Sequence, residues 1–303
     1  MVKRIFYKTV ILTTLMMTAV TGTAQNTSPE HTPPVRDANG YDSAWYKMPA
    51  NTPQNTHFEF DLKGYVFGIR MIKASYQGVI DDGRYTVRAS LNTSGLGALL
   101  KKLKIWAITD GRYDQTGLYP QTHTQQNLDK KNRRVEMNYD YDAKKVDIQI
   151  NPRLGSQGVP PATRQERFTA DDTLSAILNL MMRQSADAQK SHLNAPLCEG
   201  EVNVFDSKQH YALRMVKDGT DKKKFLGKKT DIIRCNVYYV PISGFDPEDL
   251  PSRKEAETPV KIYMVKSPEL GMYVPSRFSY KISGFTAVIK VTDMRVNGVS
   301  LKK

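Results

Sequence analysis

Residues 57–91 read HFEFDLKGYVFGIRMIKASYQGVIDDGRYTVRASL, and they decide the fold class. Phe58, Phe60 and Leu62 alternate with charged residues, which is the period of a half-buried strand. The Asp-Asp-Gly turn signal at 81–83 predicts a long hairpin with its tip there. Three glycines inside the predicted strands indicate bulges or bends that curve a sheet: Gly64, Gly68 and Gly78.

The same pattern of strand and turn recurs along the chain. It appears in KIWAITDGRYD (104–114), RRVEMNYDYDAKKVDIQI (133–150), VKIYMVKSPELGMYVPSRFSYKI (260–282) and FTAVIKVTDMRV (285–296). We read Asp-Gly in the first of these as another turn. Strands at short intervals predict a mainly β protein with one strongly curved antiparallel sheet, a half-barrel or spiral.

One segment, FTADDTLSAILNLMMRQ at 168–184, predicts a helix over about 170–184. Its apolar residues fall at i, i+3, i+4 and i+7: Leu174, Ile177, Leu178 and Met181. Thr169 and Asp172 have the spacing of a capping box, and GSQGVPPATRQE (155–166) before them reads as an irregular loop.

A single helix of this length is not stable alone, and one face of a curved sheet must be covered. We therefore expect the sheet to wrap around this helix, which lies across the concave side. Its four apolar residues are then candidates for facing a ligand cavity. The alternative is that they fill the core completely.

A shorter helix is predicted in GLGALLKKLK, residues 95–104, where leucines form one stripe with lysines opposite. Such an element resembles an interfacial membrane contact. The candidate contact residues are Leu99, Leu100, Lys101 and Lys102. The alternative is a capping helix with a solvated lysine face.

The start of the chain predicts export. A basic head and a short uncharged stretch, residues 9–20, precede small residues, which indicates a signal peptide over 1–24 and a periplasmic location. Residues 25–56 are rich in Pro, Asn, Thr and Ser and predict a flexible leader. A single curved β domain is expected over 57–303.

The charge of the chain bears on its partners. After removal of the signal segment, 41 basic residues face 31 acidic ones. This surplus favours an anionic membrane surface or an acidic partner, whereas export argues against nucleic acid. A merely solvated basic surface is the alternative.

Cys198 and Cys235 predict one disulfide in an oxidising compartment. By the loop-entropy argument it would stabilise the fold by about 3–4 kcal/mol. Two buried free thiols are the alternative.

No catalytic signature is present. The five histidines, at 31, 57, 123, 192 and 210, show no metal-ligand spacing and read as surface or strand residues. GTDKKKFLGKKT (219–230) has the wrong glycine spacing for a phosphate loop and reads as a basic hairpin tip. We expect no enzyme activity, no metal and no cofactor.

Several of these segments together resemble the exported bacterial family called domain of unknown function 3108. They are the hairpin at 58–95, ITDGRYDQTGLYPQTH (108–123), DKKNRRVEMNYD (129–140), DDTLSAILNLM (171–181), Cys235 and YVPSRFSYKISGF (273–285). The resemblance covers roughly residues 57–296. It implies a curved sheet around a helix, similar to periplasmic lipoprotein carriers and to spiral β proteins of envelope integrity. It also implies that the cysteine pair corresponds to the disulfide of those spiral proteins.

Two functions follow as hypotheses. The first is a non-enzymatic envelope protein that binds a lipid, a lipoprotein acyl chain or another amphipathic component inside the sheet. The second is a structural or scaffolding protein with a filled core that binds a protein partner or the envelope surface. A carrier requires a continuous apolar cavity of several hundred Å³, whereas a scaffold requires dense packing around the helix.

Overall fold

The computed structural model describes residues 56–100, 102–114, 117–129, 132–182, 197–282 and 285–302. The signal peptide at 1–24 and nearly all of the leader lie outside these residues. The first strand already begins at Thr56, whose side chain is buried, so the sheet starts one residue before the predicted boundary.

The described strands form one antiparallel sheet in the order β7-β6-β5-β4-β3-β2-β1-β13-β12-β11-β10-β9-β8, with β14 added to β13. Their bounds are β1 Thr56–Val66, β2 Ile69–Asp81, β3 Arg84–Thr93, β4 Lys104–Tyr113, β5 Leu118–Asn127, β6 Arg134–Asp140, β7 Lys145–Asn151, β8 Glu201–Phe205, β9 His210–Phe225, β10 Lys228–Ser243, β11 Val260–Ser267, β12 Met272–Ile282, β13 Phe285–Val296 and β14 Val299–Ser300.

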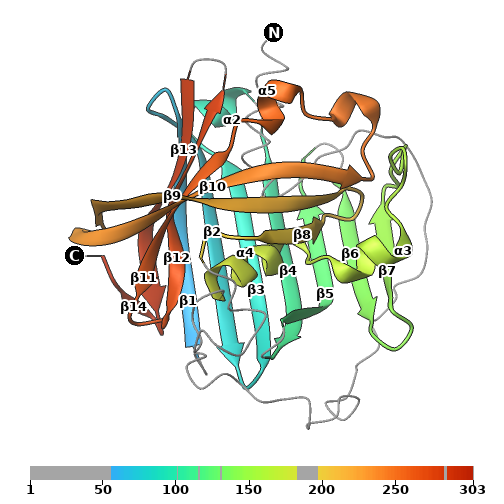
Figure 1. The fold of residues 1–303 in the computed structure, drawn as a ribbon, viewed down its shortest axis with the longest axis horizontal. Helices are drawn as coiled ribbons and strands as arrows, with labels where there is room; N and C mark the ends of the chain where they lie inside the picture. Colours follow the sequence, from blue (N-terminus) through green and yellow to red (C-terminus); the bar gives the residue numbers. More distant parts are fainter. Residues whose placement is uncertain are drawn as a thin grey trace.

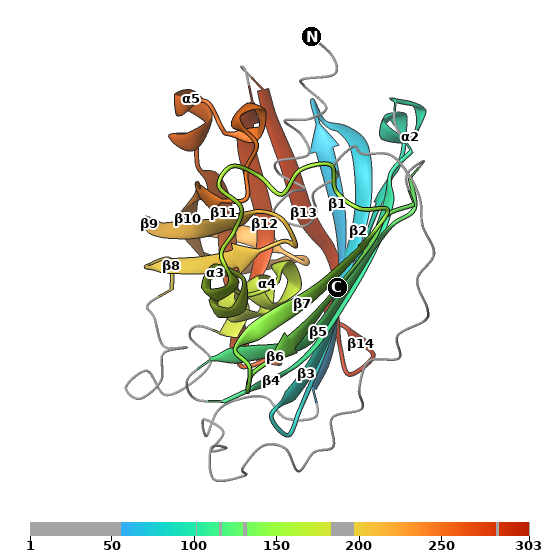
Figure 2. The ribbon, with the colours of Figure 1, turned by 90° about the vertical axis from the view of Figure 1, so that its right-hand side faces the viewer.

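The sheet is curved but open. Its two edges are β7 and β8, which do not pair with each other in the described part of the chain. The half made of β3–β7 and the half made of β8–β12 face each other across a helix, as Figure 2 shows. The predicted fold class is therefore confirmed.

Two turn predictions need correction. The first hairpin turns at Phe67 and Gly68, with φ of 52° and 75°, so Gly68 is not a strand residue. A two-residue turn of this kind needs positive φ at both positions, and the exposed loop tip accommodates Phe67 there. Conversely, Asp110 and Gly111 lie inside β4 at a break in register, not in a turn.

The other glycines and turns agree better with expectation. Gly64 lies at a break in the register between β1 and β2, as a bulge requires. Asp82 and Gly83 connect β2 to β3 as predicted. Gly78 marks no bulge, because the pairing around it is regular; a side chain there would collide with the ring of Phe58.

The helical region consists of two helices, α3 (Arg164–Thr169) and α4 (Thr173–Met182). The capping box belongs to α3 and joins Thr163 to Glu166, inside the segment predicted as irregular. The predicted box at Thr169 is wrong because Thr169 ends α3 and its hydroxyl donates to the carbonyl of Gln165. Asp172 caps α4 instead.

Helix α4 lies inside the curve of the sheet and contacts β3, β4 and β5 on one side and β8 and β12 on the other (Figure 1). Leu174, Leu178 and Met181 have no exposed surface, and they belong to the main hydrophobic core. A second, smaller core lies around Met137 and Tyr139 of β6, Ala162, Ala170 and Phe205.

The remaining helices are short: α2 (Leu96–Leu100), a 3₁₀ turn at Pro247–Asp249 and α5 (Arg253–Ala256). Helix α2 lies at one end of the sheet against β2 (Figure 1). Its predicted leucine stripe does not face the core, because Leu96 and Leu99 are exposed; Leu103, after the helix, does pack against it.

We expect Leu178→Ala to lower the free energy of unfolding by about 2–5 kcal/mol, because it opens a cavity in a packed core. Urea denaturation measures this loss. Leu250→Ala, at a half-exposed position, serves as the control and should change stability by no more than about 0.5 kcal/mol. A loss at Leu178 no larger than that of the control would contradict dense packing around α4.

Candidate functional site

A buried polar cluster holds the N-terminus of α4 on the sheet; we call it the helix clamp. Each of four consecutive strands contributes one side chain to it. They are Tyr76 of β2, Tyr85 of β3, Thr109 of β4 and His123 of β5. On the helix side the clamp consists of Asp172, Leu174 and Ser175.

Asp172 is the centre of the clamp and has no exposed surface. One carboxylate oxygen, Oδ1, accepts from the Thr109 hydroxyl at 2.7 Å and lies 3.0 Å from Nδ1 of His123. The same oxygen accepts from the backbone N–H groups of Leu174 and Ser175, so Asp172 is the N-cap of α4.

The proton positions follow from the network. The single hydroxyl proton of Thr109 goes to Asp172, so the 2.8 Å contact between Thr109 and His123 needs Nδ1–H of the imidazole as its donor. Likewise Ser175 donates to Oδ2 of Asp172, which makes the Tyr85 hydroxyl the donor to Ser175 at 2.7 Å. The hydroxyl protons of Thr109, Ser175 and Tyr85 then each have a defined acceptor.

The tyrosines reach the helix because the sheet makes room for them. A side chain at Gly111 would collide with the ring of Tyr85, to which Gly111 is paired across the strands. Tyr76 donates to the carbonyl of Leu174 at 3.0 Å. Burial, reinforced by the charge of Asp172, raises the pKa of both tyrosines well above their ordinary value, so both stay protonated donors.

Burial by itself raises the pKa of the Asp172 carboxyl. The attraction of His123 and the hydrogen bonds from His123, Ser175 and Thr109 outweigh it, so the pKa lies below its ordinary value. Asp172 is therefore a carboxylate at neutral pH, stabilised by donors from both the sheet and the helix.

The clamp does not have the order of a nucleophile-and-base triad. In such a triad a histidine lies between the hydroxyl and the carboxylate. Here Asp172 lies between Ser175 and His123, and the proton of Ser175 goes to the carboxylate. Ser175 and His123 are buried as well, and the donors around Asp172 attach the helix to the sheet.

The residue before the clamp joins α4 to the far edge of the sheet. Asp171 pairs with β8 by two backbone hydrogen bonds, donating to Asn203 at 2.9 Å and accepting from Phe205 at 2.8 Å. Its carboxylate accepts from Asn179 in α4 at 3.0 Å. The start of α4 thus bridges the β2–β5 half of the sheet and its edge at β8.

A cavity lies between α4 and strands β8–β12, on the other side of the helix from the clamp. Its volume is about 30 Å³, enough for roughly two water molecules, whereas ligand sites measure roughly 300–1,000 Å³. Thr173 and Tyr211 are its polar lining residues. The apolar lining consists of Ala176, Ile177, Leu180, Val202, Val204, Leu213, Met215, Val237, Ile262, Pro275 and Phe278.

The structure places the predicted site residues in different environments. Of the four predicted cavity residues, Ile177 lines this cavity, while Leu174, Leu178 and Met181 are packed in the core. At the predicted membrane contact, Leu99 and Lys102 are exposed, the side chain of Leu100 is outside the description, and Lys101 lies outside the described residues.

The patterns in the sequence do not predict the helix clamp. The predicted capping box places Asp172 at the third helical position instead of the cap, and the scattered histidines place His123 at an ordinary surface or strand position. The available signal was Asp172 three residues before the hydroxyl of Ser175, which is the spacing of an N-cap acid.

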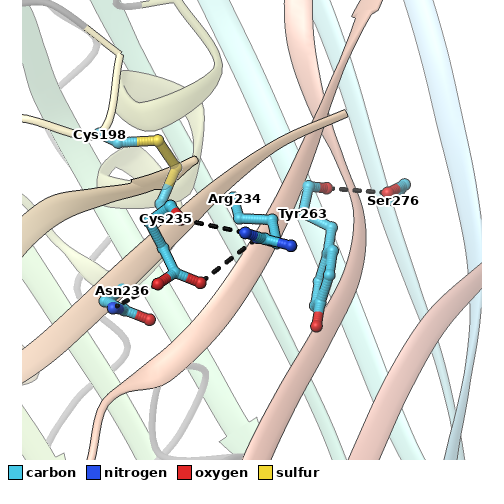
Figure 3. Close-up of a disulfide and its surroundings, with 7 residues drawn as sticks. Cys198, Arg234, Cys235, Asn236, Tyr263 and Ser276 are labelled. Atoms are coloured by element: carbon cyan, nitrogen blue, oxygen red, sulfur yellow. Dashed lines mark hydrogen bonds and ion pairs between the residues drawn. A yellow bond between two sulfur atoms is a disulfide. The ribbon is translucent and has the colours of Figure 1, made fainter. Parts of the chain in front are cut away.

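The two cysteines form the predicted disulfide, with Cα atoms 5.1 Å apart. It fastens the segment before β8 to β10, within one half of the sheet. Figure 3 shows it beside Arg234 of β10 and Tyr263 of β11, which are cross-strand partners. The hairpin at 219–230 is the predicted basic tip, with its turn at Leu226 and Gly227 between β9 and β10.

Within the described ranges, no three histidine, cysteine or acidic side chains are grouped as metal ligands would be. Nor is any helix there both long enough and apolar enough to cross a bilayer.

The fold and the clamp define an open, barrel-like β protein whose concave side is occupied by a helix tied to four strands. The chain belongs to the family described as "Protein of unknown function (DUF3108)", whose family model matches residues 59–286. The family resemblance expected from the sequence is thereby confirmed.

Two solved structures are similar. One is a "Beta-barrel-like Protein of Domain of Unknown Function DUF1849" from Brucella abortus, with 12% identity and a TM-score of 0.44, covering 82% of this chain and 99% of that one. The other is "a putative lipoprotein" from Parabacteroides distasonis, with 11% identity and a TM-score of 0.32, covering 82% and 100%. No curated protein matches the chain.

We expect Asp172→Ala to lower the free energy of unfolding at neutral pH by about 3–5 kcal/mol, because it leaves buried donors without their acceptor. The control Asp147→Ala removes an exposed ion pair with Lys145 and should cost less than about 1 kcal/mol. Urea denaturation compares the two.

The comparison of wild type with Asp172→Ala also gives a test that depends on pH. Because the folded pKa of Asp172 is lowered, its contribution is complete above the ordinary aspartate pKa of about 4 and is lost as the pH falls through the folded value. The stability difference between wild type and Asp172→Ala should therefore shrink under acid. A difference that stays constant into strong acid would contradict a charged, clamped Asp172.

Proposed function

We propose that this protein is a non-enzymatic, exported envelope protein whose concave side is filled by its own helix and which acts through its surface. The observation that carries this proposal is the packing of α4. Three of its large apolar side chains have no exposed surface, and the adjoining cavity holds only about 30 Å³.

Two further features support it. The chemistry-bearing side chains of the clamp are buried and mutually satisfied, so they serve the fold. The signal-peptide pattern at 1–24 and the disulfide fit an oxidising compartment such as the periplasm.

A second candidate function is binding of an acyl chain in the crevice between α4 and β8–β12. The observation in its favour is the lining, which is almost wholly apolar. For such a ligand to enter, α4 would have to move away from β8–β12 while the clamp held it against β2–β5. In this second function α4 would be a movable cover over the ligand site, whereas in the first it permanently fills the concave side of the sheet.

Native mass spectrometry of protein purified from the periplasm without detergent separates the two. We expect the mass of the chain without residues 1–24, no added mass, and no lipid on solvent extraction. Ile177→Trp provides the matched variant because it fills the cavity while leaving the clamp intact. A defined, stoichiometric lipid in wild type that Ile177→Trp excludes would overturn the filled-core proposal and establish the carrier.

A further inference from the structure

A row of positively charged residues crosses the convex face of the sheet. Lys73 of β2 is paired with Lys63 of β1, Lys63 with Lys290 of β13, and Lys290 with Arg277 of β12. Directly opposed residues of an antiparallel pair share a face. With a strand spacing of about 4.8 Å, four cations follow one another over roughly 14 Å.

The row continues on the other side of β2. Lys73 is paired with Asn92 of β3, and Asn92 with Lys104 of β4. We call Lys104, Lys73, Lys63, Lys290 and Arg277 the cation row. Its members are exposed or half-buried, while their strand neighbours Leu62, Ala74 and Ile289 are buried on the concave side.

Among the described residues, the cation row has no acidic partner. None of its members forms an ion pair with another described residue; Lys290 and Arg277 lie over the rings of Tyr65 and Tyr263. The sequence explains this, because residues 62–80, 84–109 and 270–292 contain no aspartate or glutamate. Like charges directly opposite each other destabilise a sheet. An external anion bound along the row would therefore reduce the repulsion between its cationic side chains.

Another basic residue of the same face, Arg295, does have acidic partners. Toward the opposite end of β1 and β13, Arg295 forms ion pairs with Glu59, Asp61 and Asp293. The cation row lies nearer the end of the sheet that carries the β1–β2 turn and α2, away from these ion pairs (Figure 1).

That end also carries exposed apolar side chains, which we call the apolar tip. Phe67 is 72% exposed, Ile69 44%, Leu96 49% and Leu99 81%. Phe67 lies in the β1–β2 turn and Ile69 follows it. Helix α2 packs against β2 beside the turn, and the backbone N–H of Ser94 donates to the carbonyl of Met71 at 2.8 Å. These residues come from separate segments that the fold brings to one end.

Lys63 and Tyr65 are outward residues of β1, and Phe67 follows them in the turn, where its exposed ring lies 4.6 Å from the ring of Phe285. At about 3.3 Å per residue, Lys63 lies roughly 13 Å behind Phe67, with the tyrosine midway. The order of these side chains, from a cation through an amphipathic ring to an apolar group, matches the decrease in polarity from the aqueous side of a membrane surface to its interior.

We propose that the apolar tip and the cation row together dock the protein on an anionic phospholipid bilayer. Phe67 and Leu99 enter the interface, and the row lies over the headgroup phosphates. This inference rests on the proposed function, since it names the surface on which a filled-core envelope protein acts.

The distance between the apolar tip and the cation row is consistent with this orientation on the membrane. Interfacial elements bury their apolar face by about 5–10 Å. With the tip at that depth, the row would lie within roughly 8 Å of the surface, which is one Debye length at physiological ionic strength. Each basic residue there strengthens binding to anionic lipid by about fivefold.

The test is co-sedimentation of the purified chain with vesicles of phosphatidylglycerol and phosphatidylethanolamine, and with phosphatidylcholine vesicles. We expect binding to the first kind only, weakened by salt. The triple variant Lys63→Gln, Lys73→Gln, Lys290→Gln should bind about a hundredfold more weakly. Its melting temperature should equal or exceed that of wild type, because like-charge contacts are removed.

The matched control removes three lysines from the β9–β10 hairpin: Lys224→Gln, Lys228→Gln, Lys229→Gln. It carries the same net charge as the row variant and should bind nearly as wild type. Leu99→Ser tests the tip at an exposed position and should weaken binding about tenfold or more.

Three outcomes would overturn the proposal: equal binding of wild type to both kinds of vesicle, equal losses in the row and hairpin variants, or wild-type binding by Leu99→Ser. None of these depends on whether the interior holds a lipid. Failure of the filled-core proposal, which extraction detects, is therefore separate from failure of membrane docking.

Discussion

The carboxylate of Asp172 is the group on which the arrangement of sheet and helix depends. A buried charge costs several kcal/mol unless hydrogen bonds compensate it, and this one is compensated only when β4, β5 and the first turn of α4 meet around it. Tyr76 and Tyr85 extend the same attachment to β2 and β3. The sheet must curve for all four strands to reach one helix terminus, so the curvature and the position of α4 are specified together.

The local features of this fold could be predicted from the sequence, because they depend on spacing along the chain. Alternation of Phe58, Phe60 and Leu62 identifies a strand without knowledge of its neighbours, and the stripe from Leu174 to Met181 identifies a helix. The long-range features could not. Thr109 and Asp172 are 63 residues apart, and they meet only once the register of β4 and β5 and the path of α4 are set.

The glycines illustrate the same limit. Gly68 and Gly111 look alike in sequence, yet one supplies positive φ in a turn and the other leaves space for the ring of Tyr85. Which role a glycine has depends on the residue opposite it. The cation row cannot be recognised in the sequence either, because its five members lie on five strands and become neighbours only through the pairing of β4, β3, β2, β1, β13 and β12.

The position of the row in the strand order also separates it from the other lysine cluster. Lys63 and Lys290 lie on β1 and β13, at the middle of the sheet, where each strand is paired on both sides. The lysines around Leu226 lie at the end of a long two-stranded hairpin. A cation held at fixed spacing by paired strands loses little conformational freedom when it meets an anionic surface, whereas a hairpin tip must first be ordered. We therefore expect similar numbers of lysines to differ in how strongly they bind such a surface, and the buried core behind β1 and β13 supports the rigidity of the row.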